Sequence, residues 1–182
     1  MNIPTLQKMV IFPMLGLFLI VGSCSGKKQS EESQETNQQQ LTSDNKSLTH
    51  PALDFTLQSI NDKKISLTDF LGNKIILMNF WATWCPYCIT EIPRLNKIKT
   101  TLADHVQVLS IDILEGPEKV KKIAQQKGIK YHVLLDQKGE VARRYRVKGT
   151  PTSIVIDKKG NIAYYGYELH KAEQVIKSLI GN

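Results

Sequence analysis

Two cysteines separated by two residues, Cys85 and Cys88, are the side chains of this 182-residue sequence best suited to chemistry. They follow an apolar run at residues 74–80 that predicts a buried strand, and they precede a segment with helical spacing of apolar residues. Residues three apart on a first helical turn lie on one face, where their sulfurs can bond. The unpaired N–H groups and the positive dipole end of the helix favour a thiolate at Cys85. The pattern therefore predicts that Cys85 is the attacking thiolate and Cys88 the resolving thiol.

The elements that must position this pair are a strand before it and a helix after it. They belong to a chain in which strands and helices are expected to alternate. Residues 86–102 are expected to form the helix, and Pro86 costs no hydrogen bond at an early helical position. Further strands are expected at residues 53–57 (an edge strand), 64–67, 106–111, 132–135, 153–156 and 162–165, and further helices at 117–127, 139–147 and 171–180. This order predicts an α/β domain with a central mixed β-sheet flanked by helices.

Length and charge limit the function classes. A chain of 182 residues is long enough for one domain with a sizeable core, and its three cysteines do not suggest a disulfide-stapled scaffold. The net charge of +7 comes from 24 basic and 17 acidic residues, without an arginine-rich run or an alternation of aromatic and basic residues. The composition favours a solvated basic surface, able to meet anionic lipid or acidic partners, over a nucleic-acid site.

Residues 1–23 resemble a secretory signal peptide of the lipoprotein type. An apolar run at residues 9–21 has the length of a signal core and is too short to span a bilayer comfortably. The V-G-S-C sequence at residues 21–24 resembles a bacterial lipobox, whose cysteine receives lipid, so Cys24 is the expected lipidation site. An uncleaved N-terminal anchor and an ordinary secreted protein with a spare cysteine are the alternatives. All three place the folded part outside the cytoplasm, where disulfides persist.

Residues 24–50 are expected to form the lipidated N-terminus and a disordered tether. They hold mainly Gln, Ser, Thr, Asn, Glu and Lys, with Leu41 and Leu48 as the only large apolar side chains. Such a segment buries too little apolar surface to offset its ordering entropy. The folded domain is therefore expected at residues 51–182.

Three stretches together resemble the TlpA/ResA-like thiol–disulfide oxidoreductases, which are extracytoplasmic, membrane-tethered members of the thioredoxin superfamily. These stretches are N-F-W-A-T-W-C-P-Y-C-I-T-E-I-P at residues 79–93, G-T-P-T at 149–152 and D-K-K-G-N at 157–161. The resemblance covers residues 51 to about 180. It implies a thioredoxin-like fold with an inserted segment that includes residues 112–127. It also implies a redox-active disulfide between Cys85 and Cys88, with no other cofactor.

The resemblance also assigns residues around the two sulfurs. It implies a cis Thr150–Pro151 peptide bond that faces the cysteines, and a Thr150 backbone that pairs with the extended chain of a substrate. Because only X-Pro bonds adopt the cis form readily, the sequence permits this arrangement. Pro86 and Tyr87 are expected to shape the turn between the cysteines, while Trp84 and Pro151 flank the sulfurs.

Proton transfer and redox direction depend on residues that differ within the superfamily. Asn79 stands where cytoplasmic thioredoxin has a buried aspartate, so Cys88 needs water or another carboxylate as its base. Asn79 itself is interpreted as a hydrogen-bonded core amide. Glu115, in the inserted segment, is a candidate for proton handling, with a solvated glutamate as the simpler interpretation. The Pro86–Tyr87 dipeptide matches glutaredoxins and tunes the redox potential, so net reduction and net oxidation of substrates both stay open.

Metal and peroxide chemistry have less support. A zinc site needs four ligands, of which Cys85 and Cys88 supply two, and no metal site is expected. The histidines stand singly, without ligand spacing: His50, His105, His132 and His170. A copper(I) chaperone stays an alternative, because copper(I) accepts two thiolates. A peroxidase would need a threonine three residues before Cys85, where Ala82 stands.

The residues and the resemblance together predict an enzyme that reduces protein disulfides outside the cytoplasm. Its partners would be disulfide-bonded proteins, with apocytochrome c before haem attachment as one candidate, and a membrane thiol reductant as electron donor. The lipid anchor would hold the enzyme on the periplasmic side of an inner or outer membrane, or at a cell surface. Net oxidation of substrates and copper delivery are the two alternatives.

Overall fold

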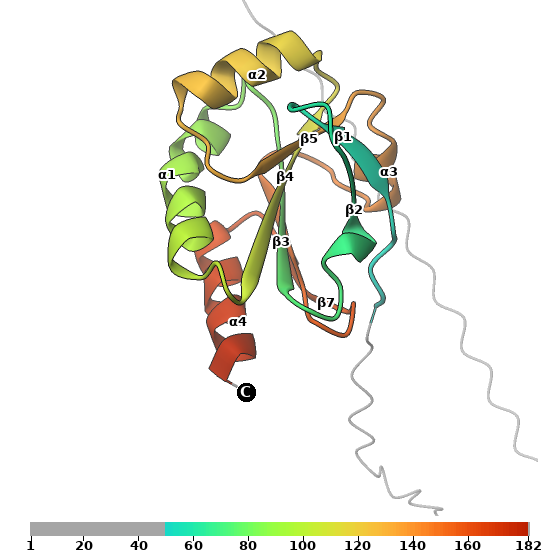
Figure 1. Ribbon diagram of the computed structural model, residues 1–182, viewed down its shortest axis with the longest axis vertical. Coiled ribbons are helices and arrows are strands. Elements are labelled where there is room, and N and C mark those ends of the chain that lie inside the picture. Colours follow the sequence, from blue (N-terminus) through green and yellow to red (C-terminus); the bar gives the residue numbers. More distant parts are fainter. Residues whose placement is uncertain (1–49, 182) are drawn as a thin grey trace, which may run out of the picture. The chain divides into compact units, whose positions relative to one another are not determined.

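The computed structural model of the protein describes residues 50–181, which Figure 1 shows as a coloured ribbon. The expected signal peptide, Cys24 and the expected tether up to residue 49 lie outside the described residues. Within residues 50–181, none of the helices combines the length and the apolar character needed to cross a membrane.

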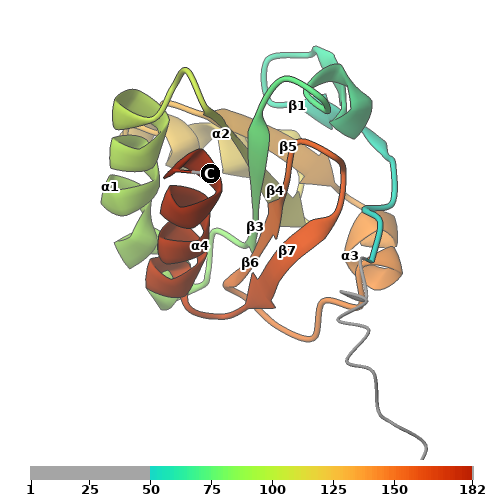
Figure 2. The ribbon, with the colours of Figure 1, turned by 90° about the horizontal axis from the view of Figure 1, so that it is seen from below.

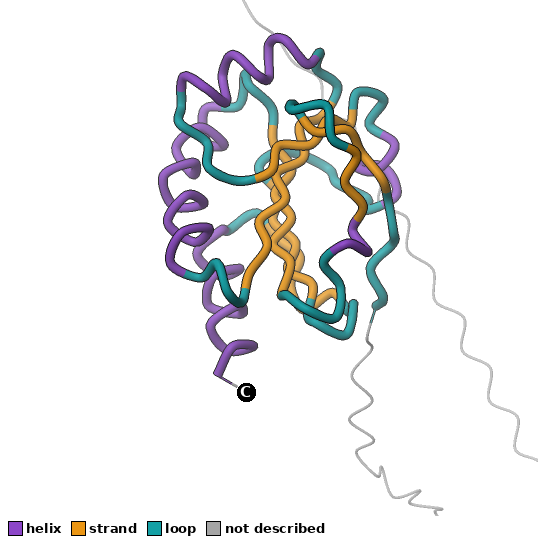
Figure 3. The backbone as a smooth tube through the Cα atoms, in the orientation of Figure 1, coloured by secondary structure: helices purple, strands orange, loops and turns teal. Residues whose placement is uncertain are grey.

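A seven-stranded mixed sheet, in the order β2-β1-β5-β4-β3-β6-β7, forms the centre of residues 50–181 (Figure 3). Its strands are β1 (Thr56–Ser59), β2 (Lys64–Ser66), β3 (Ile75–Trp81), β4 (Val106–Ile113), β5 (His132–Asp136), β6 (Thr152–Ile156) and β7 (Ile162–Gly166). The helices of the same part are the 3-10 turn η1 (Leu67–Asp69), α1 (Pro86–Thr101), α2 (Pro117–Gln126), α3 (Glu140–Arg144) and α4 (Leu169–Gly181). Strands β3, β4 and β5 run parallel, while β1, β2, β6 and β7 pair antiparallel with their neighbours. The predicted α/β domain with a mixed sheet is therefore confirmed.

Helices cover both faces of the sheet because its central strands are apolar on both sides. Strand β3 reads IILMNFW and is buried at every position. On one face α1, α2 and α4 pack around Leu77, Leu95 and Ile176, while η1 and α3 pack on the other face around Phe80 and Val141. Figure 2 shows α1 and α4 on one side of β3 and β6, with α3 on the other. The helices on both faces hold the carboxyl end of β3 in place, and the cysteine pair comes directly after this end in the sequence.

The first strand differs from the sequence prediction. An edge strand is predicted at residues 53–57, but β1 begins at Thr56 and lies inside the sheet, between β2 and β5. Its last two residues pair with β5, so β2 takes the edge instead. The segment before β1 is held by Tyr145, whose hydroxyl donates a hydrogen bond to the Leu53 carbonyl at 2.7 Å.

Helix α3 is shorter than the helix predicted at residues 139–147. Gly139 before it has φ 64° and Arg146 after it has φ 55°, and neither left-handed residue can continue a right-handed helix. The chain then runs as a loop to the Thr150–Pro151 peptide bond, which is cis. Because Thr152 of β6 pairs with the penultimate residue of β3, this loop lies beside the segment that carries the cysteines.

Candidate active site

The two cysteines form a disulfide where β3 passes into α1, with an S–S distance of 2.08 Å. Cys85 is the N-cap of α1, and its Sγ accepts a hydrogen bond from the backbone N–H of Cys88 at 3.2 Å. Pro86 occupies the first turn, where no backbone donor is lost. The free N–H groups and the dipole of this helix end favour negative charge on the Cys85 sulfur after reduction. The local geometry predicted from the sequence is therefore present.

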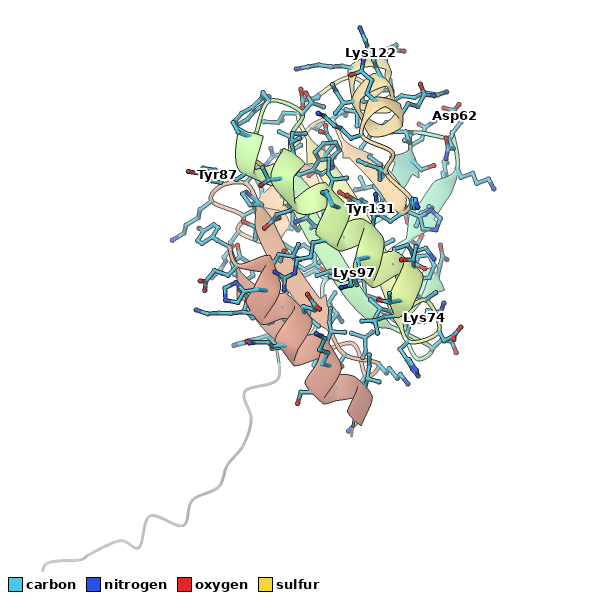
Figure 4. All side chains as sticks on the ribbon, turned by 90° about the vertical axis from the view of Figure 1, so that its left-hand side faces the viewer. Asp62, Lys74, Tyr87, Lys97, Lys122 and Tyr131 are labelled. Atoms are coloured by element: carbon cyan, nitrogen blue, oxygen red, sulfur yellow. A yellow bond between two sulfur atoms is a disulfide. The ribbon has the colours of Figure 1, made fainter. Side chains whose placement is uncertain are left out.

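Two exposed aromatic side chains border a buried pair of sulfurs. Cys85 and Cys88 are only 3% and 2% exposed, whereas Trp84 is 68% and Tyr87 is 76% exposed. Figure 4 shows Tyr87 at the N-terminal end of α1, with its side chain directed away from the domain. Large exposed rings beside a reactive bond offer contact area to a partner protein.

The structure brings Trp84 and Thr150 together, although the sequence separates them widely. Both line a hollow of about 350 Å³, which they share with Leu114. Pro151 is half-buried directly before β6, and its cis bond to Thr150 agrees with the expectation from the resemblance.

Asn79 connects the sheet to a carboxylate on α1. It is 2% exposed, and its Nδ2 donates to Oε2 of Glu91 and to Oγ of Ser153, each at 3.4 Å. This agrees with its interpretation as a hydrogen-bonded core amide. Burial raises the pKa of Glu91 to about 6, against the opposing effects of the Asn79 amide and of Arg94. Since Glu91 follows Cys88 by three residues on α1, the two lie on the same side of the helix.

Glu91 is a site residue to which the sequence interpretation assigns no role, although it stands inside the quoted stretch. The available signal is its i+3 spacing from Cys88 on a helix that starts at the cysteines. Its half-buried position and its contact with Asn79 arise only when α1 packs on β3. Glu91 is thus a carboxylate one helical turn after Cys88, held by the amide at position 79.

Glu115 holds the active-site loop. Its Oε2 accepts the backbone N–H of Thr83 at 2.6 Å, and its Oε1 accepts the Thr83 hydroxyl at 2.7 Å and Lys119 Nζ at 2.5 Å. The side chain is 7% exposed, so the simpler interpretation as a solvated glutamate is wrong. Burial opposes ionisation, but the hydrogen bonds from Lys119 and Thr83 lower the pKa of Glu115 below its ordinary value. Glu115 is therefore an ionised tether at neutral pH; proton handling by Glu115 stays a prediction, which the lowered pKa disfavours.

Asp112 is a second carboxylate that the sequence does not reveal. It lies at the end of the apolar strand β4, is fully buried, and neither of its oxygens has a hydrogen-bond partner among residues 50–181. Its neighbour in register on β3 is Trp81, whose indole N–H is likewise buried without a partner there. Burial, together with repulsion from Glu115, raises the pKa of Asp112 to about 8. A carboxyl group with a raised pKa thus lies on β4, next to the end of β3 that leads to the cysteines.

The described residues hold no cluster of three or more His, Cys, Asp or Glu side chains arranged to bind a metal ion. The four histidines are exposed and far apart in the sequence, with His132 on β5, His170 on α4, and His50 and His105 outside the helices and strands. The candidate site comprises the two sulfurs, the exposed rings of Trp84 and Tyr87, and three carboxyl groups whose pKa values are shifted, raised for Glu91 and Asp112 and lowered for Glu115.

Comparison with known proteins agrees with this geometry. The AhpC/TSA family profile matches residues 48–165. The chain is 36% identical over 112 residues to the thiol-disulfide oxidoreductase ResA of Bacillus thuringiensis subsp. konkukian, covering 61% of this chain and 64% of ResA. The match therefore spans less than two thirds of that relative's length.

Two solved structures share the fold. One is a thiol:disulfide interchange protein of the thioredoxin family from Chlorobium tepidum, with a TM-score of 0.64 and 29% identity over 72% of this chain and 96% of the other. The second is the pneumococcal exposed lipoprotein thioredoxin Etrx1 from Streptococcus pneumoniae, with a TM-score of 0.58 and 27% identity over 69% of this chain and 99% of the other. The thioredoxin-like fold and the ResA-like resemblance are confirmed, and the chain belongs to the AhpC/TSA family.

Proposed function

We propose that this protein is a thiol–disulfide oxidoreductase that reduces protein disulfides outside the cytoplasm. The observation that carries the proposal is the Cys85–Cys88 disulfide at the start of α1, with Cys85 as the N-cap. The similarity to a thiol-disulfide oxidoreductase and to a thiol:disulfide interchange protein supports the same chemistry. Trp84 and Tyr87 give a substrate protein an exposed surface beside the bond.

In the reducing direction, the Cys85 thiolate attacks one sulfur of a substrate disulfide. A bond forms between Cys85 Sγ and that sulfur, the substrate S–S bond breaks, and the departing thiolate takes a proton from water. Cys88 then loses its proton, attacks Cys85 Sγ and releases the second substrate thiolate. The substrate gains two electrons, and the protein is left with the Cys85–Cys88 disulfide, which an external dithiol must reduce.

Glu91 is the base that we assign to the second step. It lies one helical turn after Cys88, and its pKa of about 6 leaves it ionised yet basic enough to take a proton near neutral pH. Asn79 orients it through the amide hydrogen bond. Trp84 and Pro151 flank the sulfurs in this proposal, Pro86 and Tyr87 shape the turn between them, and the Thr150 backbone pairs with the substrate chain.

The electron donor is proposed to be a membrane thiol reductant, and apocytochrome c before haem attachment is one candidate substrate. Net oxidation of substrates is the reverse use of the same steps, and a copper(I) chaperone is the alternative from another class. Insulin reduction by the reduced protein, with the redox potential measured against glutathione, separates these functions. Rapid reduction and a potential below that of glutathione would support a reductant, and a higher potential would favour an oxidant. Copper(I) transfer to an acceptor without insulin reduction would favour the chaperone.

We also propose that Cys24 is lipidated and that residues 24–50 tether the domain to a membrane. The lipobox-like sequence supports this, as does the similarity to a protein described as an exposed lipoprotein. Membrane fractionation and mass spectrometry of the mature N-terminus test the anchor. A soluble protein with a free Cys24 thiol would contradict it.

A further inference from the structure

A group of four cations lies on α3 and on the loop after it. Arg143, Arg144, Arg146 and Lys148 are all exposed, and none takes part in the salt bridges found among residues 50–181. One guanidinium nitrogen of Arg143 donates to the Lys138 carbonyl, which leaves its charge uncompensated. Unpaired cations gathered within six residues create a positive potential at the surface, which attracts anionic groups.

Two hollows share Lys148 as a lining residue. The first, of about 350 Å³, is the one that Trp84 and Thr150 line, and Leu114 and Arg143 are also part of its wall. The second, of about 390 Å³, is bounded by Tyr145, Arg146, Tyr165 and Tyr167. Both hollows therefore combine apolar or aromatic walls with at least two cations, and the first reaches the residues beside the disulfide.

The walls of these hollows contain two residues in the left-handed backbone region and several exposed apolar or aromatic side chains. Leu114 is 67% exposed with φ 64°, and Arg146 has φ 55°, a left-handed region that costs non-glycine residues free energy. The Arg146 carbonyl accepts a hydrogen bond from the Tyr165 hydroxyl at 2.9 Å, which holds this conformation. Tyr165 and Tyr167 are themselves 42% and 55% exposed. Exposed apolar rings beside unpaired cations are typical of a surface that binds another molecule.

We propose that the two hollows form one docking surface for an acidic segment of the substrate protein. In the substrate sequence, this segment lies next to the disulfide-bonded cysteine that Cys85 attacks. The proposal rests on the proposed function and adds the class of substrate. Its occupant is chosen by charge complementarity: carboxylates meet Arg143, Arg146 and Lys148, while apolar side chains enter beside Leu114 and Tyr167. Because Trp84 and Thr150 line the first hollow, a segment seated there brings its cysteine to the disulfide.

Binding is tested first, without any redox step. Two fluorescent peptides of equal length lack cysteine, carry the same apolar residues, and differ in having either three Glu or three Lys residues. We expect the full-length protein to bind the acidic peptide at least about tenfold more tightly than the basic one in low salt, with the difference falling as salt screens the charges. Equal binding of the two peptides would overturn the proposal. So would binding to vesicles containing anionic lipid without binding to the acidic peptide.

A matched pair of charge reversals locates the surface. Lys148→Glu should lower the affinity for the acidic peptide about tenfold, whereas Lys122→Glu, which makes the same charge change on exposed α2, should leave it within about twofold. Figure 4 marks Lys122 on that helix. Equal losses in both variants would indicate only net charge, and would overturn the assignment of the site. Melting temperatures verify that both variants are folded.

Single-turnover reduction then tests whether binding at this surface speeds the reduction of the substrate disulfide. The protein is reduced with dithiothreitol, freed of it, and mixed with disulfide-bonded versions of the two peptides. The ratio of the acidic to the basic rate constant should exceed about five for the parent and for Lys122→Glu, and should approach one for Lys148→Glu. If the parent binds the acidic peptide selectively but reduces neither disulfide, the proposed function fails while the docking surface stands. If it reduces both equally fast, the function stands and the docking surface fails.

Discussion

The carboxylate of Glu115 accepts hydrogen bonds from both the backbone N–H and the hydroxyl of Thr83, at 2.6 and 2.7 Å. This places the segment after β4 in direct contact with the loop two residues before Cys85. The redox pair is therefore held from two directions, by α1 through its N-cap and by Glu115 through Thr83.

Replacing Glu115 should destabilise the domain. We expect Glu115→Ala to lower the free energy of unfolding by about 2 kcal/mol, since charge-assisted hydrogen bonds to a buried carboxylate are lost. Because the folded pKa of Glu115 is lowered, this stabilisation is present at neutral pH and disappears as the pH falls below about 4.5 through the folded pKa. Urea unfolding at pH 7 and at a series of lower pH values below 4.5 measures both effects. Glu118→Ala, an exposed glutamate on α2, is the control and should cost at most about 0.5 kcal/mol.

Cys85, rather than Cys88, should trap substrates. Cys85 is the N-cap and benefits from the helix dipole, whereas Cys88 lies inside the first turn. Cys88→Ser should therefore accumulate mixed disulfides that non-reducing gels and mass spectrometry detect, and Cys85→Ser should not. Accumulation in Cys85→Ser alone would reverse the assignment of attacking and resolving thiols.

Glu91 should govern the pH dependence of the resolving step. Its pKa is about 6, so the rate at which Cys88 closes the disulfide should rise with pH through that value as the base becomes ionised. In Glu91→Gln we expect a rate at least about 100-fold lower near pH 7, with no inflection near pH 6. Release of a chromophoric thiol from its mixed disulfide with Cys85 reports the step. Glu173→Gln, which loses a carboxylate paired with Arg94, is the control and should retain the inflection.

Asp112 should make stability depend on pH in the opposite sense to Glu115. Its folded pKa of about 8 lies above the ordinary 3.8, so the native state binds the extra proton between these values. The contribution of Asp112 to the free energy of unfolding should therefore be highest at low pH, and it should fall as the pH rises from about 4 through about 8. Relative to the parent, the free energy of unfolding of Asp112→Asn should increase by about 2 kcal/mol or more between pH 5 and pH 9, because the variant has no proton to lose.

Denaturant unfolding across this range measures the difference, and parallel curves for parent and variant would show that Asp112 does not titrate there. Asp104→Asn, at an exposed position, is the control and should follow the parent.

The sequence by itself determined the class of fold and the redox pair. Apolar periodicity separated β3 from α1, and the spacing of Cys85 and Cys88 placed two sulfurs on one helical turn. The sequence is sufficient here because periodicity and spacing depend only on residues that are neighbours in the chain. The same local reasoning placed Pro86 in the first turn and Asn79 in the core. It failed for β1, since the sequence alternation shows that a strand forms but does not say whether a second strand will pair with its free edge.

Only the tertiary structure decided which carboxyl groups contact the end of β3 and the loop that leads to the cysteines. Asn79 meets Glu91 because α1 folds back over β3, and Glu115 meets Thr83 because the chain after β4 reaches the end of β3, across 32 positions of sequence. Asp112 looks like an ordinary acidic residue in the sequence, yet the strands beside it remove all of its water. The pKa of a carboxylate depends on burial and on partners brought from distant segments, which no local pattern records. For the same reason, the hollows around Lys148 exist only once α3, β7 and the cysteine loop come together.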